Sequence, residues 1–124
     1  LGDVYKRQVD LISEEGWKYA NYAVSQAYGA TSATRLKQRF DWIKEYIGPE
    51  RYIVTENFES WAATGGVTFR DPERGEMPSL LGMAYWNPVE GRKGGLGTFH
   101  MEYEFSNNYK YLRQAIQIMN PAKK

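Results

Sequence analysis

Five polar or aromatic residues stand at the ends of three apolar stretches of this chain. They are Gln26, Tyr28, Glu56, Asn57 and Trp86. An aromatic ring can stack on the apolar face of a sugar, while amide and hydroxyl groups hydrogen-bond to its polar rim. Ligands bind at the carboxyl ends of parallel strands in α/β proteins, so these residues predict a site for a polar, ring-shaped ligand. The alternative is that Gln26 and Asn57 only satisfy backbone groups of their loops.

The spacing of apolar residues predicts the elements that place these side chains. Apolar runs at residues 22–24, 52–55 and 80–86 have the length of strands, and their continuous character is typical of strands covered on both faces. Helical spacing predicts a helix from the N-cap Ser32 to the stop at Gly48, and another over about residues 108–120. Residues 60–78 and 91–97 are rich in glycine or proline and are predicted loops. The pattern indicates an α/β fold with parallel strands.

Three such strands make neither a closed barrel nor a stable open sheet, because two apolar edges would stay unpaired. We therefore expect the chain to be the C-terminal piece of a larger protein, with a free-standing small domain as the alternative. Residues 1–8 include Asp3-Val4-Tyr5-Lys6-Arg7-Gln8, which is similar to the in-frame translation of a sequencing-library adaptor. Native sequence is therefore expected from Val9 onward.

The composition limits the classes of function. The chain has 16 basic and 15 acidic residues, which gives no support to binding of nucleic acid or of an anionic membrane. No apolar run approaches the ~20 residues of a membrane-spanning helix. There is no cysteine, which excludes disulfides and thiolate metal ligands. The content of 4 Trp, 10 Tyr and 5 Phe suits carbohydrate binding, although half or more of these rings are expected to pack a core.

The other chemistry-bearing residues are weaker candidates. Glu56 and Glu59 lie around one strand end but need not converge, so a local catalytic pair is not expected. Glu102 and Glu104 are predicted to share a solvated face. His100 has no second histidine and no cysteine to complete a metal shell, so no metal site is expected. Of these carboxylates, Glu56 is the one predicted to hydrogen-bond at the rim of the sugar site.

Several motifs resemble glycoside hydrolase family 18. Gln26-Ala27-Tyr28 after a strand is similar to the sixth-strand motif of this family, and residues 81–86 resemble its eighth strand, which ends in tryptophan. Residues 94–104 and 108–121 resemble the branch that contains the F-type endo-β-N-acetylglucosaminidases of Bacteroidetes. The resemblance covers residues 17–121 and implies the last three strands of a (β/α)8 TIM barrel. Residues 9–124 are thus expected to form the C-terminal portion of a barrel glycosidase domain.

The resemblance implies cleavage of β-1,4 bonds between N-acetylglucosamine units, by an endo-β-N-acetylglucosaminidase or a chitinase-like enzyme. The acetamido oxygen of the substrate attacks the anomeric carbon, while a glutamic acid protonates the leaving oxygen. By position, Tyr28 would donate to the acetamido oxygen, Gln26 would bind nearby and Trp86 would form the floor of the sugar subsite. The family's acidic motif, Asp-Gly-x-Asp-x-Asp-x-Glu, is absent from this chain, so no catalytic residue is assigned and the general acid is expected upstream.

Further expectations follow from the resemblance. The partners would be a glycan that contains N-acetylglucosamine and the N-terminal part of the same barrel, with no cofactor, metal or nucleic acid. The protein would be secreted, periplasmic or displayed at the cell surface. The alternative function is that of a barrel that has lost its acid and survives as a glycan-binding protein, because Gln26, Tyr28 and Trp86 serve binding as well as catalysis.

Overall fold

The computed structural model describes residues 14–122. Residues 1–13 and 123–124 lie outside the described part of the chain, and so does the expectation of an adaptor-derived segment at residues 1–8. Among residues 14–122, no helix has both the length and the apolar character needed to cross a membrane.

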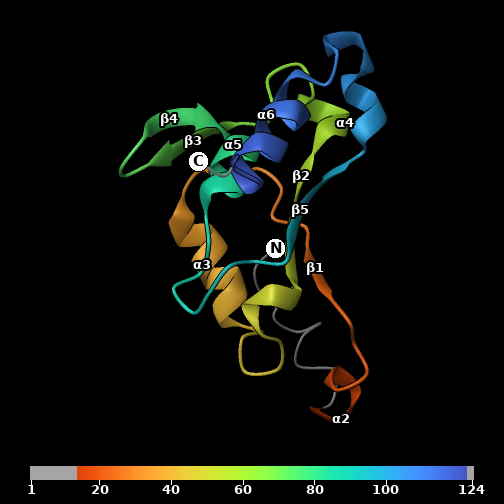
Figure 1. The fold of residues 1–124 in the computed structure, drawn as a ribbon, viewed down its shortest axis with the longest axis vertical. Coiled ribbons are helices and arrows are strands. Elements are labelled where there is room, and N and C mark those ends of the chain that lie inside the picture. The colour runs from red at the N-terminus through yellow and green to blue at the C-terminus, as the bar shows by residue number, and fades with distance from the viewer. Residues whose placement is uncertain (1–13, 123–124) are drawn as a thin grey trace.

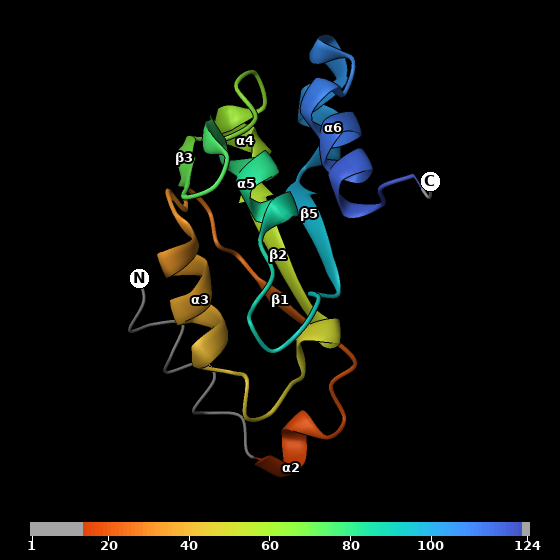
Figure 2. The ribbon, with the colours of Figure 1, turned by 60° about the vertical axis from the view of Figure 1, so that its left-hand side comes forward.

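A three-stranded parallel sheet forms the centre of the fold (Figure 2). Its strands are β1 (Ala23–Ser25), β2 (Tyr52–Asn57) and β5 (Gly95–Phe99), in the spatial order β1-β2-β5. Val24 pairs with Ile53, which in turn pairs with Gly95, so the three carboxyl ends lie at one edge of the sheet. The prediction of an α/β fold with parallel strands is confirmed.

Helices connect the strands and cover one face of the sheet (Figure 1). α3 (Ala33–Asp41) links β1 to β2, α5 (Ser79–Tyr85) precedes β5, and α6 (Lys110–Met119) follows it. Ser32 holds the predicted N-cap position of α3, without a side-chain cap hydrogen bond. The shorter elements are the helices α2 (Glu14–Trp17) and α4 (Phe58–Trp61) and the 3₁₀ helices η1 (Pro49–Arg51) and η2 (Met101–Asn107).

The apolar run at residues 80–86, predicted as a strand, is mostly helix α5. Residues 79–84 of this helix are all buried, because α5 lies between the sheet, α6 and a β-hairpin. A helix that is covered on every side shows no amphipathic period, so its short apolar sequence cannot be told from that of a buried strand. Its leucines, methionine and alanine favour a helix, and it contains no β-branched residue.

The third parallel strand, β5, comes instead from the glycine-rich segment that was predicted as a loop. Glycine is required there because neighbouring backbone and side chains approach closely. A Cβ added at Gly94 would lie 2.3 Å from the backbone oxygen of Glu50, and one at Gly97 would lie 3.3 Å from Cγ2 of Thr55. These glycines therefore allow close packing against β2 and the residues just before it. In the sequence alone, the same glycines indicate a flexible loop.

A hairpin occupies part of the predicted loop at residues 60–78. β3 (Thr68–Asp71) pairs antiparallel with β4 (Gly75–Pro78). Phe69 of β3 is buried against α5, where a Cβ at Gly82 would lie 2.3 Å from its ring. The backbone N–H of Arg70 donates to the oxygen of Thr31, which joins the hairpin to the approach to α3.

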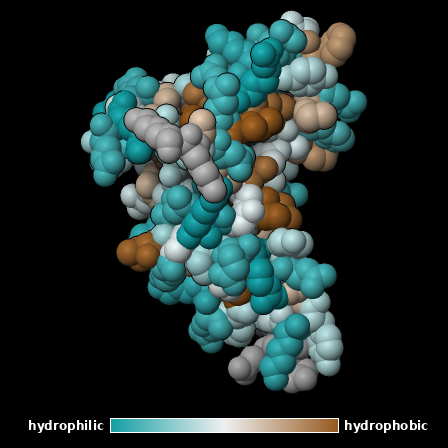
Figure 3. All heavy atoms as spheres, in the orientation of Figure 1, coloured by the Kyte–Doolittle hydropathy of each residue, from teal (hydrophilic) through white to brown (hydrophobic). Residues whose placement is uncertain are grey.

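The two faces of the sheet differ in burial. Along β2, Tyr52, Val54 and Glu56 are fully buried and alternate with less buried residues. On the opposite face, Val24 of β1 is 57% exposed and Phe99 of β5 is 45% exposed. The expectation that both faces are covered is therefore wrong for the described residues. Figure 3 shows hydrophobic side chains reaching the surface beside the strands, within a largely hydrophilic exterior.

Candidate functional site

The carboxyl edge of the sheet carries three of the predicted site residues at accessible positions. Gln26 is exposed, whereas Tyr28 and Asn57 are partly buried. Gln26 and Tyr28 lie between β1 and α3, and Asn57 is the last residue of β2. Because Ser25 of β1 pairs with Val54 of β2, the two segments leave the sheet as neighbours. The structure thus places two amides and a phenol at one edge, as the strand order predicts.

Asn57 also has a task within the protein. Its side-chain oxygen accepts a 2.8 Å hydrogen bond from the backbone N–H of Glu59 and caps the start of α4. This is the loop-stabilising role that the sequence offers as the alternative for Asn57. The cap uses the amide oxygen only, so the amide nitrogen on the same side chain can still donate to a ligand.

Glu56 does not lie at the rim of the site. Its side chain is on the covered face of β2 and is fully buried. Oε1 accepts hydrogen bonds from the backbone N–H groups of Gly29, at 2.9 Å, and Asn57, at 2.8 Å. Oε2 accepts from the hydroxyl of Ser79 at the start of α5. The expected rim position is therefore wrong, because both carboxyl oxygens bind groups of the protein.

Burial raises the pKa of the Glu56 carboxyl above its ordinary value of 4.5. The hydrogen bonds from Ser79, Asn57 and Gly29 act in the opposite direction, because each stabilises the carboxylate. Burial is the larger effect, since the low-dielectric surroundings disfavour the charged form more than these donors favour it.

Trp86 lies at the other end of the sheet. It follows α5 as its C-cap residue and packs against the core between α3 and the sheet. Its backbone oxygen accepts a 2.5 Å hydrogen bond from Nζ of Lys93, and the next residue, Gly94, donates to the backbone oxygen of Tyr52 at the start of β2. The prediction that Trp86 ends a strand is therefore wrong, because the run before it forms a helix that is antiparallel to the strands.

Aromatic rings do gather at the carboxyl end of β5, where they were not predicted. Phe99 ends this strand and pairs with Asn57 in the register. The ring of His100 lies 3.9 Å from that of Phe99 and 5.5 Å from that of Tyr103, centroid to centroid. Phe99 and Tyr103 are both more than one-third exposed. The signal was present as Thr98-Phe99-His100, but it becomes visible only if the preceding glycines are assigned to a strand.

The remaining acidic residues have separate tasks. Glu59 is exposed and does not join the buried Glu56 as a pair. Glu102 is exposed and lies 3.4 Å from Nδ1 of His100, whereas Glu104 is fully buried. The predicted solvated face is therefore wrong for Glu104, because its segment folds as η2 and turns that side chain inward. Within the described part of the chain, no group of three or more His, Cys, Asp or Glu side chains could hold a metal ion.

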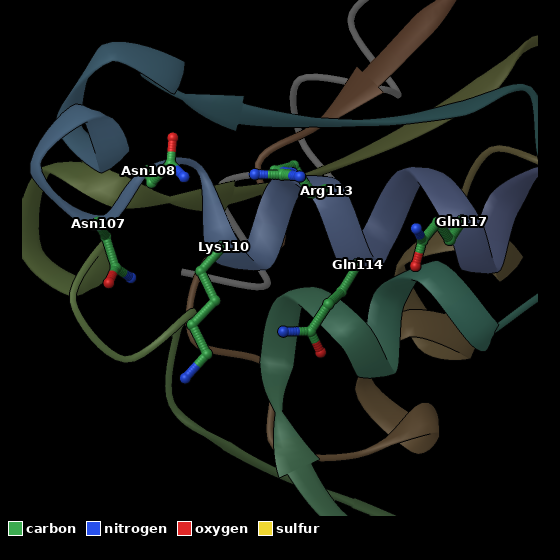
Figure 4. A pocket seen from close by; sticks show the side chains of 6 residues that line it. All are labelled: Asn107, Asn108, Lys110, Arg113, Gln114 and Gln117. Carbon is green, nitrogen blue, oxygen red and sulfur yellow. The ribbon is translucent and has the colours of Figure 1, made fainter.

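Two cavities lie beside α6. One of 930 Å³ lies between α5, α6 and the hairpin, with Leu81, Tyr85 and Ile118 among its lining residues. Another of 390 Å³ lies along the polar side of α6, where Figure 4 shows Lys110 and Gln114 extending from the helix. Gln26, Tyr28 and Asn57 are not among the residues that line these two cavities.

Comparison with known proteins connects this geometry to a family. The chain matches the model of glycoside hydrolase family 18, BT1044-like, over residues 6–118. A solved structure of BT1044, a selenomethionine form with a Glu-to-Gln substitution, shares 33% identity at a TM-score of 0.79 and covers 92% of this chain and 37% of its own. A search among curated proteins finds no match.

A second solved structure shares the fold. It is an endo-β-N-acetylglucosaminidase from Cordyceps militaris, in a variant with Asp-to-Asn and Glu-to-Gln substitutions and in complex with fucosyl-N-acetylglucosamine-Asn. Its identity is 22% and its TM-score 0.66, and the match covers 86% of this chain and 38% of that chain. The chain thus spans less than two-fifths of either solved relative. Because the family model covers nearly the whole sequence, the resemblance seen in its motifs is confirmed, and the chain belongs to the BT1044-like group of glycoside hydrolase family 18.

Proposed function

We propose that this chain forms the sugar-binding end of a glycoside hydrolase that cleaves β-1,4 bonds between N-acetylglucosamine units. The observation that carries the proposal is the meeting of Gln26, Tyr28 and Asn57 at the carboxyl edge of a parallel sheet. The exposed rings of Phe99 and Tyr103 follow at the same edge. Family membership supports the reaction class, and the sugar bound in the Cordyceps relative supports the ligand class.

The uncovered face of the sheet supports a place for this chain within a longer barrel. Parallel sheets are normally covered on both faces, whereas Val24 and Phe99 here are exposed. The match covers only 37% of the BT1044 chain. We assign the covering of this face, and the general acid, to the remaining strands of that barrel, because the family's acidic motif is not among these 124 residues.

In the proposed reaction the 2-acetamido oxygen of the substrate attacks the anomeric carbon. The glycosidic bond breaks as the general acid gives its proton to the leaving oxygen, and water then opens the oxazolinium and returns a proton to the acid. Tyr28 donates to the acetamido oxygen, while the amides of Gln26 and Asn57 bind polar groups of the sugar. Each such hydrogen bond contributes on the order of 1 kcal/mol, and more where charge develops in the transition state.

The test uses the longer protein that contains this chain, with N-glycans and chitin oligosaccharides as substrates. Tyr28→Phe removes only the hydroxyl and is expected to lower kcat/KM about 10- to 100-fold. Tyr19→Phe is the matched control, because Tyr19 is 81% exposed and precedes β1 at the opposite end of the sheet. A wild-type protein inert on both substrate classes contradicts the proposal. Binding without hydrolysis would instead favour a glycan-binding protein.

A further inference from the structure

Glu56 is a buried carboxylate that joins the two strand ends at which the sugar site is assembled. We propose that Glu56 is a positioning residue, which fixes the segment carrying Gln26 and Tyr28 against Asn57 and so sets the geometry of the site. The inference rests on the proposed function, because it concerns how the same sugar-binding edge is held. It gives Glu56 a task other than the ligand contact expected from its place at a strand end.

The first contact fixes the segment after β1. Oε1 of Glu56 accepts a 2.9 Å hydrogen bond from the backbone N–H of Gly29, the residue directly after Tyr28. Gly29 has a φ of +71°, a left-handed conformation that glycine adopts without strain. A Cβ at this position would also lie 3.2 Å from the ring of Trp61. The chain therefore turns sharply behind Tyr28, and the buried carboxylate holds that turn.

The second contact fixes the end of β2 through the same oxygen. Oε1 also accepts a 2.8 Å hydrogen bond from the backbone N–H of Asn57. A single oxygen atom thus binds the backbone beside Tyr28 and the backbone of Asn57. Moving the two strand ends apart therefore lengthens at least one of these two hydrogen bonds.

The third contact fixes Glu56 itself. Oε2 accepts from the hydroxyl of Ser79, whose oxygen in turn accepts from the backbone N–H of Val67 at 2.9 Å. The backbone N–H of Ser79 donates to the oxygen of Val67 at 2.7 Å, so the start of α5 and the loop after α4 are joined at two points. Gly66 lies against this group, since a Cβ there would meet the Ser79 hydroxyl. Both oxygens of the carboxylate are therefore held by hydrogen bonds inside the protein, as a positioning group requires.

The substitutions separate this role from simple stability. Glu56→Gln keeps an oxygen that can accept from Gly29 and Asn57, whereas Glu56→Ala removes it. Lys93→Met is the matched control, because Lys93 is also buried and hydrogen-bonded but lies at the amino end of the sheet. The probe is the thiazoline analogue of N-acetylglucosamine, which mimics the oxazolinium and needs no general acid to bind. Its affinity is measured in the longer protein by calorimetry, together with kcat and KM on an N-glycan.

We expect Glu56→Ala to weaken thiazoline binding about 10-fold or more and to lower kcat rather than raise KM, because misplaced groups lose transition-state contacts first. Glu56→Gln should stay within about 3-fold of wild type, and Lys93→Met should bind as wild type does at a temperature where both are folded. Hydrogen exchange of residues 26–29 should rise in Glu56→Ala and not in Lys93→Met. If Glu56→Ala fails to fold, hydrogen exchange is compared between Ser79→Ala and Glu56→Gln instead. Ser79→Ala should raise the exchange of residues 26–29, whereas Glu56→Gln should not.

Three results would overturn the inference. One is wild-type affinity in Glu56→Ala, and another is a loss in Lys93→Met equal to that in Glu56→Ala, which would assign the effect to stability alone. A third is a loss in Glu56→Gln as large as in Glu56→Ala, since the acceptor oxygen would then be insufficient. A wild-type protein that neither binds the thiazoline nor cleaves glycans refutes the proposed function and the inference with it, and is thereby distinguished from the three results above.

Discussion

The carboxylate of Glu104 accepts a 2.7 Å hydrogen bond from the backbone N–H of Tyr111 and so closes the start of α6 from outside the helix. Its other oxygen accepts from the backbone N–H of Leu112 at 3.0 Å. These N–H groups belong to the first turn of α6, and N–H groups of a first turn have no acceptor within the helix. The N-cap residue itself, Tyr109, supplies no side-chain cap, so Glu104 takes that task from η2.

We therefore expect Glu104→Ala to lower the free energy of unfolding by about 1–3 kcal/mol, because it leaves two N–H groups at the start of α6 without an acceptor. Glu102→Ala is the matched control two residues away, where the side chain is exposed and is expected to change stability by about 0.5 kcal/mol or less. Urea unfolding of both variants measures the difference. Equal effects of the two substitutions would show that the cap contributes nothing.

Lys93 makes a pH-dependent contribution to stability. Its Nζ donates to the backbone oxygens of Ala84, at 2.9 Å, and Trp86, at 2.5 Å, near the C-terminus of α5. Burial, with a smaller effect from the charge of Arg92, lowers the pKa of Lys93 from 10.5 to about 8. Below pH 8 the lysine is protonated in both states, but between pH 8 and 10.5 the folded state releases the proton first.

The unfolded state thus binds more protons in this window, so Lys93 makes the protein more stable as pH rises from 8 to 10.5. The gain is up to about 3 kcal/mol. Lys93→Met lacks this contribution. The other lysines and the tyrosines are present in both proteins, so their contributions cancel in the difference between the two free energies of unfolding. Urea unfolding at both ends of the window tests it. A wild-type protein that loses stability relative to Lys93→Met with rising pH would contradict the sign.

Gly66 and Gly75 provide a matched pair of glycines at positive φ. Gly66 has a φ of +114°, and an added Cβ would overlap the Ser79 hydroxyl, whereas Gly75 has a φ of +83° with open space around it. Gly75→Ala is expected to cost about 1 kcal/mol from backbone strain alone. Gly66→Ala is expected to cost at least about 2 kcal/mol more, because Ser79 must move away from Glu56. Thermal unfolding measures the loss of stability in each variant. Equal losses would show that Ser79 can move away from the added methyl group at no cost in free energy.

Two strands and most of two helices could be predicted because local patterns agree with their burial, although α3 ends at Asp41 and not at the predicted stop, Gly48. Ile53, Val54 and Thr55 are β-branched and form β2, while Leu36 and Phe40 recur at helical spacing in α3. α5 could not be predicted, since burial on all sides removes the periodic signal of a helix. β5 could not be predicted either, because its glycines reflect the close approach of β2, which is a property of the folded structure.

The positions of the candidate site residues could be predicted only where place along the strand is enough. Gln26, Tyr28 and Asn57 needed only the rule that strand ends meet at one edge. For Glu56 the face of the strand must be known as well. Tyr52, Val54 and Glu56 are alternate residues of β2, so they lie on the same, covered face. The residue type favours a ligand contact instead, and the structure shows that the alternation decides.

The raised pKa of Glu56 predicts that its contribution to stability decreases with rising pH, which is opposite to the effect of a carboxylate whose pKa is lowered by folding. Because burial raises this pKa above 4.5, the folded state retains a proton that the unfolded state has released in the window above pH 4.5. The stability contributed by Glu56 is therefore fully present below pH 4.5 and decreases as pH rises through its folded pKa. Glu56→Gln cannot titrate, so its stability should gain on that of wild type as pH rises across this window.

The difference between wild type and Glu56→Gln isolates this effect. Asp41 and Asp71 have pKa values lowered mainly by hydrogen bonds, from Lys37 and from the backbone of Glu73 respectively. They act with the opposite sign below pH 3.8, but both are present in each protein and cancel in the difference. Urea unfolding at a series of pH values from 4.5 to neutrality gives the slope. A difference that is constant with pH would mean that the three hydrogen bonds to Glu56 offset its burial completely, so that its pKa is the same in the folded and unfolded states.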